Sequence, residues 1–138
     1  MFLFGDILEA LIWQIQPKKP TILVEGVNNT QDRQKLVWTY KKEEVSETIE
    51  RVTFQRRRDN ADPGEDIAIS TKEIEFDVFS KFISNYSASI QPTISTLILK
   101  NPVTNDDEFI YSIVMSVSKN NRPAPGLNDN VQLIVFGK

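Results

Sequence analysis

The strongest constraint on the fold is a period of two in the apolar residues. It is clearest over residues 108–118, where Phe109, Tyr111, Ile113, Met115 and Val117 occupy every second position. Successive side chains of a β-strand point to opposite faces, so these five should share one buried face. Shorter runs of the same kind recur between turn residues along the chain, which is typical of an all-β sandwich.

The predicted strands are separated by Pro, Gly, Asn and Asp. They cover residues 11–16, 21–25, 35–40, 48–56, 82–90, 94–100, 108–118 and 131–136, with additional edge elements at 66–70 and 74–79. Residues 57–65 read as a turn-rich connection, and 119–130 as a long polar loop restricted by Pro123 and Pro125. The alternation places Ile22, Val24, Leu36, Trp38, Tyr40, Val131, Leu133 and Val135 on inner faces as well.

Composition excludes several kinds of chemistry. The 138 residues include no cysteine and no histidine, which removes thiol nucleophiles, histidine bases and zinc sites built from these residues. The net charge of -3 argues against a dedicated nucleic-acid binder. No phosphate-binding loop or nucleophile elbow is present. We therefore expect neither an enzyme nor a cofactor, and calcium at the acidic turn of residues 105–108 is a minor alternative.

The N-terminal segment leaves three alternatives open. Residues 1–10 contain Phe2, Leu3, Phe4, Ile7 and Leu8, interrupted by Asp6 and Glu9. The segment lacks the basic start of a signal peptide, and it is too short and too charged to span a membrane. We interpret residues 1–10 as a leader, a signal remnant or a cloning scar, and residues 11–138 as one domain, which is long enough to fold without a disulfide.

Two motifs resemble parts of a variable-type immunoglobulin-like domain. Trp38, within residues 36–40, resembles the tryptophan of strand C, and Asp107 followed by Tyr111 resembles the tyrosine corner that opens strand F. The resemblance places the two core cysteines at Val24 and Ile113, and neither is cysteine. It implies an all-β immunoglobulin-like sandwich with two antiparallel sheets in a Greek key, without the inter-sheet disulfide.

Within that group the chain resembles the cysteine-poor ectodomain modules of cnidarian allorecognition proteins. The matching stretches are residues 21–26, 36–42, 81–82, 95–101 and 107–113, within a resemblance that covers about residues 11–137. The resemblance implies that the Tyr111 hydroxyl bonds to nearby backbone and that Asp107 pairs with Lys81. Departures are the missing cysteines, Phe109 where a small residue is usual, and a long separation of Val24 from Ile113. The separation implies an insertion between strands C′ and D.

The resemblance also implies homophilic recognition of self and non-self at the cell surface. The expected partner is a protein, with a second copy of the chain, and hence a homodimer, as the first candidate. The alternative is a structural subunit that assembles into a filament or lattice through its apolar N-terminal segment. Glycan binding would favour exposed aromatic residues, which the predicted binding face has few of.

The predicted binding face is the outer face of the sheet that contains strands C, C′, F and G, together with the F–G loop. Its residues are Val37, Thr39, Thr53, Gln55, Ser112, Val114, Ser116, Gln132 and Ile134, with Asn121 and Arg122 in the loop. They combine apolar and small polar groups with few charges, as the core of an interface does. A solvated sheet face with scattered apolar residues is the plainer interpretation. Asn28 and Asn85 begin N-glycosylation sequons, and the basic run at residues 56–58 reads as a solvated strand end.

Overall fold

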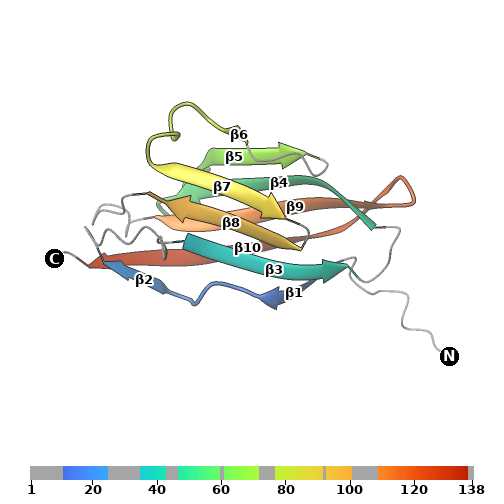
Figure 1. Cartoon of the computed structure of the whole chain (residues 1–138), viewed down its shortest axis with the longest axis horizontal. Helices are drawn as coiled ribbons and strands as arrows, with labels where there is room; N and C mark the ends of the chain where they lie inside the picture. Colours follow the sequence, from blue (N-terminus) through green and yellow to red (C-terminus); the bar gives the residue numbers. More distant parts are fainter. Residues whose placement is uncertain are drawn as a thin grey trace.

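The chain folds into two β-sheets packed face to face in a computed structural model, which describes residues 11–24, 35–42, 47–59, 61–71, 77–91, 93–100 and 109–136 (Figure 1). One sheet contains β1 (Leu11–Ile15), β3 (Lys35–Lys42), β8 (Ile94–Leu99) and β7 (Tyr86–Gln91), in that order. The other contains β2 (Thr21–Val24), β10 (Arg122–Phe136), β9 (Ile110–Lys119), β4 (Glu47–Arg57), β5 (Glu65–Thr71) and β6 (Asp77–Val78). All pairs are antiparallel except β2 with β10.

The core lies between the two sheets and is built by the alternating residues of their inner faces. Its main members are Leu36, Trp38, Tyr40, Leu97 and Leu99 from one sheet, and Val52, Phe54, Tyr111, Ile113, Met115, Val131 and Leu133 from the other. The inward orientation predicted for the alternating residues of β3 and β9, and for Val131 and Leu133, is therefore confirmed. Ile22 was predicted to point inward, but it is 58% exposed. Three consecutive apolar residues in the short strand β2 define no phase of alternation.

The strand that carries Trp38 was assigned to the wrong sheet. In a variable-type sandwich, strands A, B, E and D form one sheet and C, F and G belong to the other. The strand β3 lies beside β1 and β8 in the four-stranded sheet, so it takes the place of strand B. The strand next to β9 is β4, which the sequence analysis took as C′, and its Phe54 contacts Trp38 with ring centroids 5.6 Å apart.

The positions predicted for the two core cysteines of the family are also wrong as a pair. Val24 lies on β2 and Ile113 on β9, and both strands belong to the six-stranded sheet. An inter-sheet bridge could therefore not join them. Alternation identifies the inner face of a strand, but both sheets have such a face, so the pattern around Trp38 could not tell one sheet from the other.

The polar loop predicted at residues 119–130 is instead a tight hairpin. Lys119 pairs with Arg122, and the two turn residues between them, Asn120 and Asn121, have φ of 55° and 62°. Positive φ at both central residues is the geometry of a type I′ turn, which asparagine tolerates. Pro123 and Pro125 lie in the first part of β10, which pairs with β9 on one side. Among the described residues, the other side of β10 pairs with β2 only at Leu133–Phe136. The two prolines therefore lie where β10 is an edge strand, and an edge tolerates a residue without an N–H.

The predicted edge elements after β4 are present as β5 and β6. Residues 1–10, the Asn28 sequon, the acidic turn at 105–108 and Asp107 lie outside the described residues. Within the described part of the chain, no helix has the length and hydropathy that crossing a membrane requires.

Candidate protein-binding face

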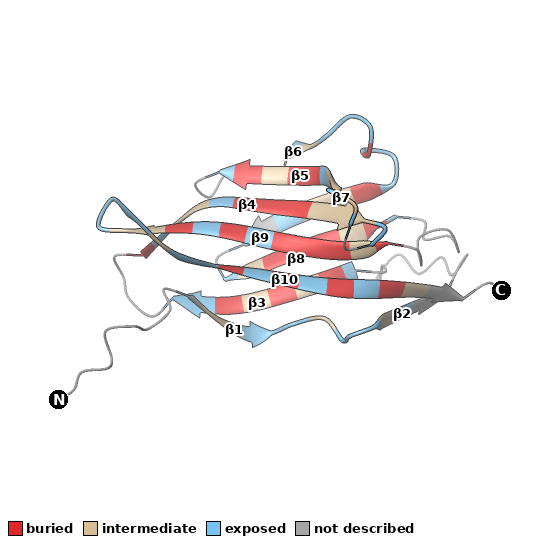
Figure 2. Cartoon of the chain, turned by 180° about the vertical axis from the view of Figure 1, so that it is seen from behind, coloured by how far each residue is buried: buried red, intermediate tan, exposed pale blue. Residues whose placement is uncertain are grey.

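The outer face of the six-stranded sheet has an apolar centre at Val114. The strand register places Val114 between Asn128 of β10 and Thr53 of β4, and Thr53 in turn beside Ile69 of β5. Val114 is 38% exposed. Ile110 and Ile134 lie on the same face and are half-buried. Buried and exposed residues alternate along β9 and β10, as Figure 2 shows, so this face is separate from the core.

Several polar residues of this face are hydrogen-bonded to one another. The Arg57 guanidinium donates to Ser112 Oγ at 3.1 Å, and Ser112 Oγ donates to Asn130 Oδ1 at 2.6 Å. On the neighbouring strands, Gln55 Nε2 donates to Asp66 Oδ1 at 2.7 Å. These contacts explain why Ser112 points outward and is nevertheless only 3% exposed. Five polar residues of this face, Gln55, Arg57, Asp66, Ser112 and Asn130, therefore have hydrogen bonds within the chain.

The structure brings together most of the residues predicted for the binding face. Thr53, Gln55, Ser112, Val114, Ser116, Gln132 and Ile134 lie on β4, β9 and β10 of the six-stranded sheet, and Asn121 and Arg122 are exposed at the β9–β10 turn. Val37 and Thr39 do not join them. Both residues lie on β3 of the four-stranded sheet, so the common face predicted for them is wrong, because the strand was assigned to the wrong sheet.

Several residues of this face were not predicted from the sequence. Arg57 was assigned to a turn, although the alternation that includes Thr53 and Gln55 continues to it. Asn128 and Asn130 were assigned to the loop that proved to be part of β10. Asp66 and Ile69 belong to β5, whose pairing with β4 depends on contacts that local sequence does not reveal.

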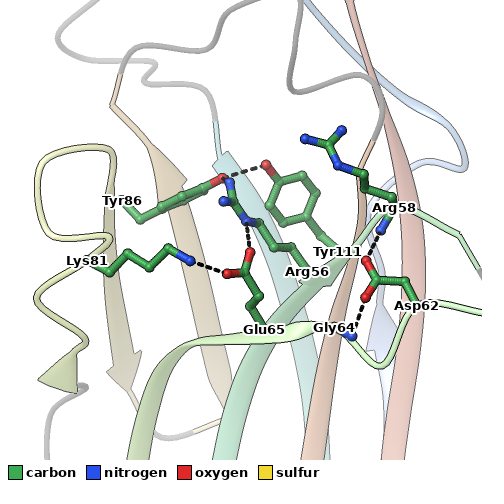
Figure 3. A network of polar contacts seen from close by, with 8 residues as sticks. All are labelled: Arg56, Arg58, Asp62, Gly64, Glu65, Lys81, Tyr86 and Tyr111. Atoms are coloured by element: carbon green, nitrogen blue, oxygen red, sulfur yellow. Dashed lines mark hydrogen bonds and ion pairs between the residues drawn. The ribbon is translucent and has the colours of Figure 1, made fainter.

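A cluster of cationic and aromatic side chains surrounds Arg56, which Figure 3 shows with Tyr86 and Tyr111. The Arg56 guanidinium lies 4.6 Å from the ring centroid of Phe82 and 4.1 Å from that of Phe109, and it donates to Tyr86 Oη at 3.1 Å. Tyr86 Oη in turn lies 2.7 Å from Tyr111 Oη. Arg56 is therefore packed into the structure, unlike the solvated strand end predicted for residues 56–58.

Glu65 joins this cluster to the turn before β7. It forms ion pairs with Arg56 and with Lys81, and the hydrogen bond from Lys81 is the main reason why the pKa of Glu65 lies below its usual value. Lys81 was predicted to pair with Asp107, which lies outside the described residues. Lys81 instead pairs with Glu65, so its cation joins the turn before β7 to β5.

A second polar cluster joins the two sheets. Trp38 Nε1 donates to Asp129 Oδ2 at 2.9 Å, and Lys19 forms an ion pair with Asp129 Oδ1. Burial raises the pKa of Asp129, but the hydrogen bonds from Lys19, Trp38 and Gln16 outweigh it and hold this pKa below its usual value. The carboxylate is thus kept charged between the sheets, as a structural link.

One of the predicted glycosylation sites can be located. Asn85 is exposed in the turn before β7, and its backbone carbonyl accepts a hydrogen bond from Lys100 N at 2.9 Å. Glycosylation at Asn85 stays a prediction, as it does for Asn28.

Comparison with known proteins identifies the fold. No family model and no curated protein sequence matches the chain. The structure is similar to murine CRIg, with a TM-score of 0.71 at 12% identity over 91% of this chain and 97% of that one. It is also similar to a chain from the structural study of T cell specificity and activation by the bacterial superantigen toxic shock syndrome toxin-1, with a TM-score of 0.67 at 14% identity over 91% and 99% of the two chains. For chicken TCR the TM-score is 0.63 at 16% identity, over 90% of this chain and 50% of that one. The chain is an immunoglobulin-like β-sandwich of variable type without cysteine.

Proposed function

We propose that the chain is a non-enzymatic recognition module that binds a second copy of itself through the outer face of the six-stranded sheet. The observation that carries the proposal is the exposed Val114 near the middle of that face, with the half-buried Ile69, Ile110 and Ile134 on the same face. An apolar centre with a polar rim is the usual anatomy of a protein interface. Asn121 and Arg122, at the type I′ turn between β9 and β10, extend the proposed surface.

The polar network lowers the cost of covering this face. Burying a polar group without a partner is unfavourable, and removing its water costs less when a hydrogen bond within the chain remains. The bonds from Arg57 to Ser112 and from Ser112 to Asn130 meet this condition. A partner can therefore cover the centre of the face without supplying a hydrogen bond for each of these groups.

The charges of the face favour a copy of the same chain as the partner. Arg51 and Arg57 lie on β4, whereas Asp66 and Asp77 lie on β5 and β6 toward one edge of the sheet. A twofold axis turns one copy over the other, so the basic side of each face can meet the acidic side of its partner. Recognition between cells, as the resemblance to allorecognition modules implies, and an extracellular or cell-surface location belong to this proposal. The structural similarity to chicken TCR supports this proposal.

The experiment is sedimentation velocity over a concentration series. We expect the unaltered chain to dimerise and Val114→Glu to weaken the dimer by about 100-fold or more, because an unpaired carboxylate in a closed interface costs several kcal/mol. Ser89→Glu, at an exposed position on β7 of the other sheet, is the matched control and should leave the dimer intact. A dimer that persists in Val114→Glu would show that another surface makes the contact.

A second candidate is a structural subunit that assembles through residues 1–10. It is favoured by two apolar side chains on the opposite side of the fold from β5, Ile15 and Ile22, which are 61% and 58% exposed. The two candidates use different surfaces, so variants can separate them.

A further inference from the structure

The chain passes from one sheet to the other between β1 and β2, and a hollow of about 490 Å³ lies at this crossing. Its apolar lining consists of Ile15, Pro17, Pro20, Ile22 and Val37. Ile15 and Ile22 have the largest exposed fractions among the large hydrophobic residues of the described chain. Exposed apolar residues that gather around a depression mark a binding site more strongly than the same residues scattered over a surface.

The charged residues of the hollow are all basic. Lys18 and Lys35 line it, and its remaining polar residues, Gln16 and Thr21, are uncharged. Lys18 and Lys35 are both exposed. The occupant that fits is therefore an apolar segment that carries negative charge, since complementary charge selects a partner.

The sequence of this chain contains such a segment. Residues 1–10 include six large apolar side chains, Met1, Phe2, Leu3, Phe4, Ile7 and Leu8. The only charged side chains in the segment belong to Asp6 and Glu9. Its apolar content matches the isoleucines and prolines of the hollow, and its two carboxylates match Lys18 and Lys35.

We propose that residues 1–10 of a second copy dock in this hollow. The proposal rests on the second candidate function and names the surface that it uses. Residue 10 precedes Leu11, whereas the hollow lies at the other end of β1, beside Ile15. The strand is about 15 Å long, so the segment of the same chain would have to turn back along β1 to enter its own hollow. The segment of a neighbouring copy meets no such constraint.

Docking of this kind is a heterologous contact, in which a donor segment of one copy meets the hollow of another. Reciprocal exchange closes it as a dimer, and successive donation extends it into an open chain. In both cases association requires an intact donor in one copy and an intact hollow in the other. This requirement is the basis of the test.

The test uses the full chain with Val114→Glu throughout, which removes the contact of the first candidate function. Sedimentation velocity is measured for this chain alone, with Phe4→Glu added to alter the donor, and with Ile22→Glu added to alter the hollow. We expect the Val114→Glu chain to associate and each added substitution to weaken that association by about tenfold or more. We expect an equimolar mixture of the two double variants to associate, because it contains one intact donor and one intact hollow.

Three results would contradict docking of residues 1–10 in the hollow of a second copy. A Val114→Glu chain that stays monomeric would overturn this inference and leave the first candidate function standing. Association that neither added substitution changes would also overturn it, and so would a mixture of the two double variants that remains monomeric. Ile15→Glu replaces Ile22→Glu if circular dichroism shows that the latter does not fold.

Discussion

At the scale of single residues, Asp129 has an unusual position for a carboxylate. It is 7% exposed, accepts a hydrogen bond from Trp38 across the core, and pairs along β10 with Ile113 of β9. Ile113 is the position at which the resemblance to variable-type domains expects the cysteine of strand F. A link between the sheets therefore lies beside the place where a disulfide would be expected, and a buried carboxylate is tolerated because it is paired and hydrogen-bonded.

Replacing Asp129 should separate its hydrogen bond from its charge. We expect Asp129→Ala to lower the free energy of unfolding by about 2–4 kcal/mol, since the buried Trp38 N–H loses its acceptor. Asp129→Asn retains an acceptor for Trp38 and loses only the ion pair with Lys19, whose side chain is 49% exposed, so it should cost about 1 kcal/mol or less. Urea denaturation measures both. Equal losses in the two variants would contradict the role given to the hydrogen bond.

At the scale of elements, alternation located the strands but not their neighbours. The predicted strands at residues 35–40, 94–100 and 108–118 correspond closely to β3, β8 and β9. The burial pattern of a strand follows from the alternation of apolar and polar residues within that strand, so local sequence is sufficient to predict it. Sheet membership depends on distant partners, and for this reason Trp38 was placed on strand C. Asn120 and Asn121 suit a type I′ turn, so the sequence contains a signal for the β9–β10 hairpin. The hairpin was nevertheless predicted as a loop, because Pro123 and Pro125 follow the turn.

Gly126 allows β10 to pass close to β9. The register shifts between Ala124 and Leu127, and a Cβ atom on Gly126 would lie 2.0 Å from the carbonyl oxygen of Met115. Gly126→Ala must therefore displace backbone, and we expect it to lower the free energy of unfolding by about 1–3 kcal/mol. Asn128→Ala, at an exposed position of the same strand, is the control and should change it by less than about 0.5 kcal/mol. Guanidinium denaturation of both variants would test this, and equal stabilities would refute it.

At the scale of the whole molecule, the two candidate surfaces differ in how far the sequence revealed them. The face around Val114 was largely predictable, because once Ile113 and Met115 are known to point inward, Ser112, Val114 and Ser116 must point outward. The hollow at Ile15 and Ile22 was not predictable. It exists because β1 and β2 belong to different sheets, and only the folded topology shows that the chain crosses there.

The carboxylates of the two polar clusters predict how stability responds to acid. The pKa values of Asp129 and Glu65 are both lower in the folded chain than in the unfolded chain. As pH falls below about 4, the unfolded chain therefore binds more protons than the folded chain does. The stabilisation that the two carboxylates provide is complete at pH values above their pKa values in the unfolded chain. It is lost as pH falls through their pKa values in the folded chain. Glu65 is partly exposed, so salt should screen its share, whereas the share of the buried Asp129 should persist.

Urea midpoints between pH 6 and pH 2.5, measured at low and at high salt, would test this expectation. The unaltered chain should lose stability toward low pH under both conditions, and Asp129→Asn should have a shallower dependence that high salt flattens further. The same pH dependence in both chains would mean that the carboxylate between the sheets gains little from Lys19 and Trp38. The inter-sheet link would then depend on packing of Trp38 against Phe54 and not on charge.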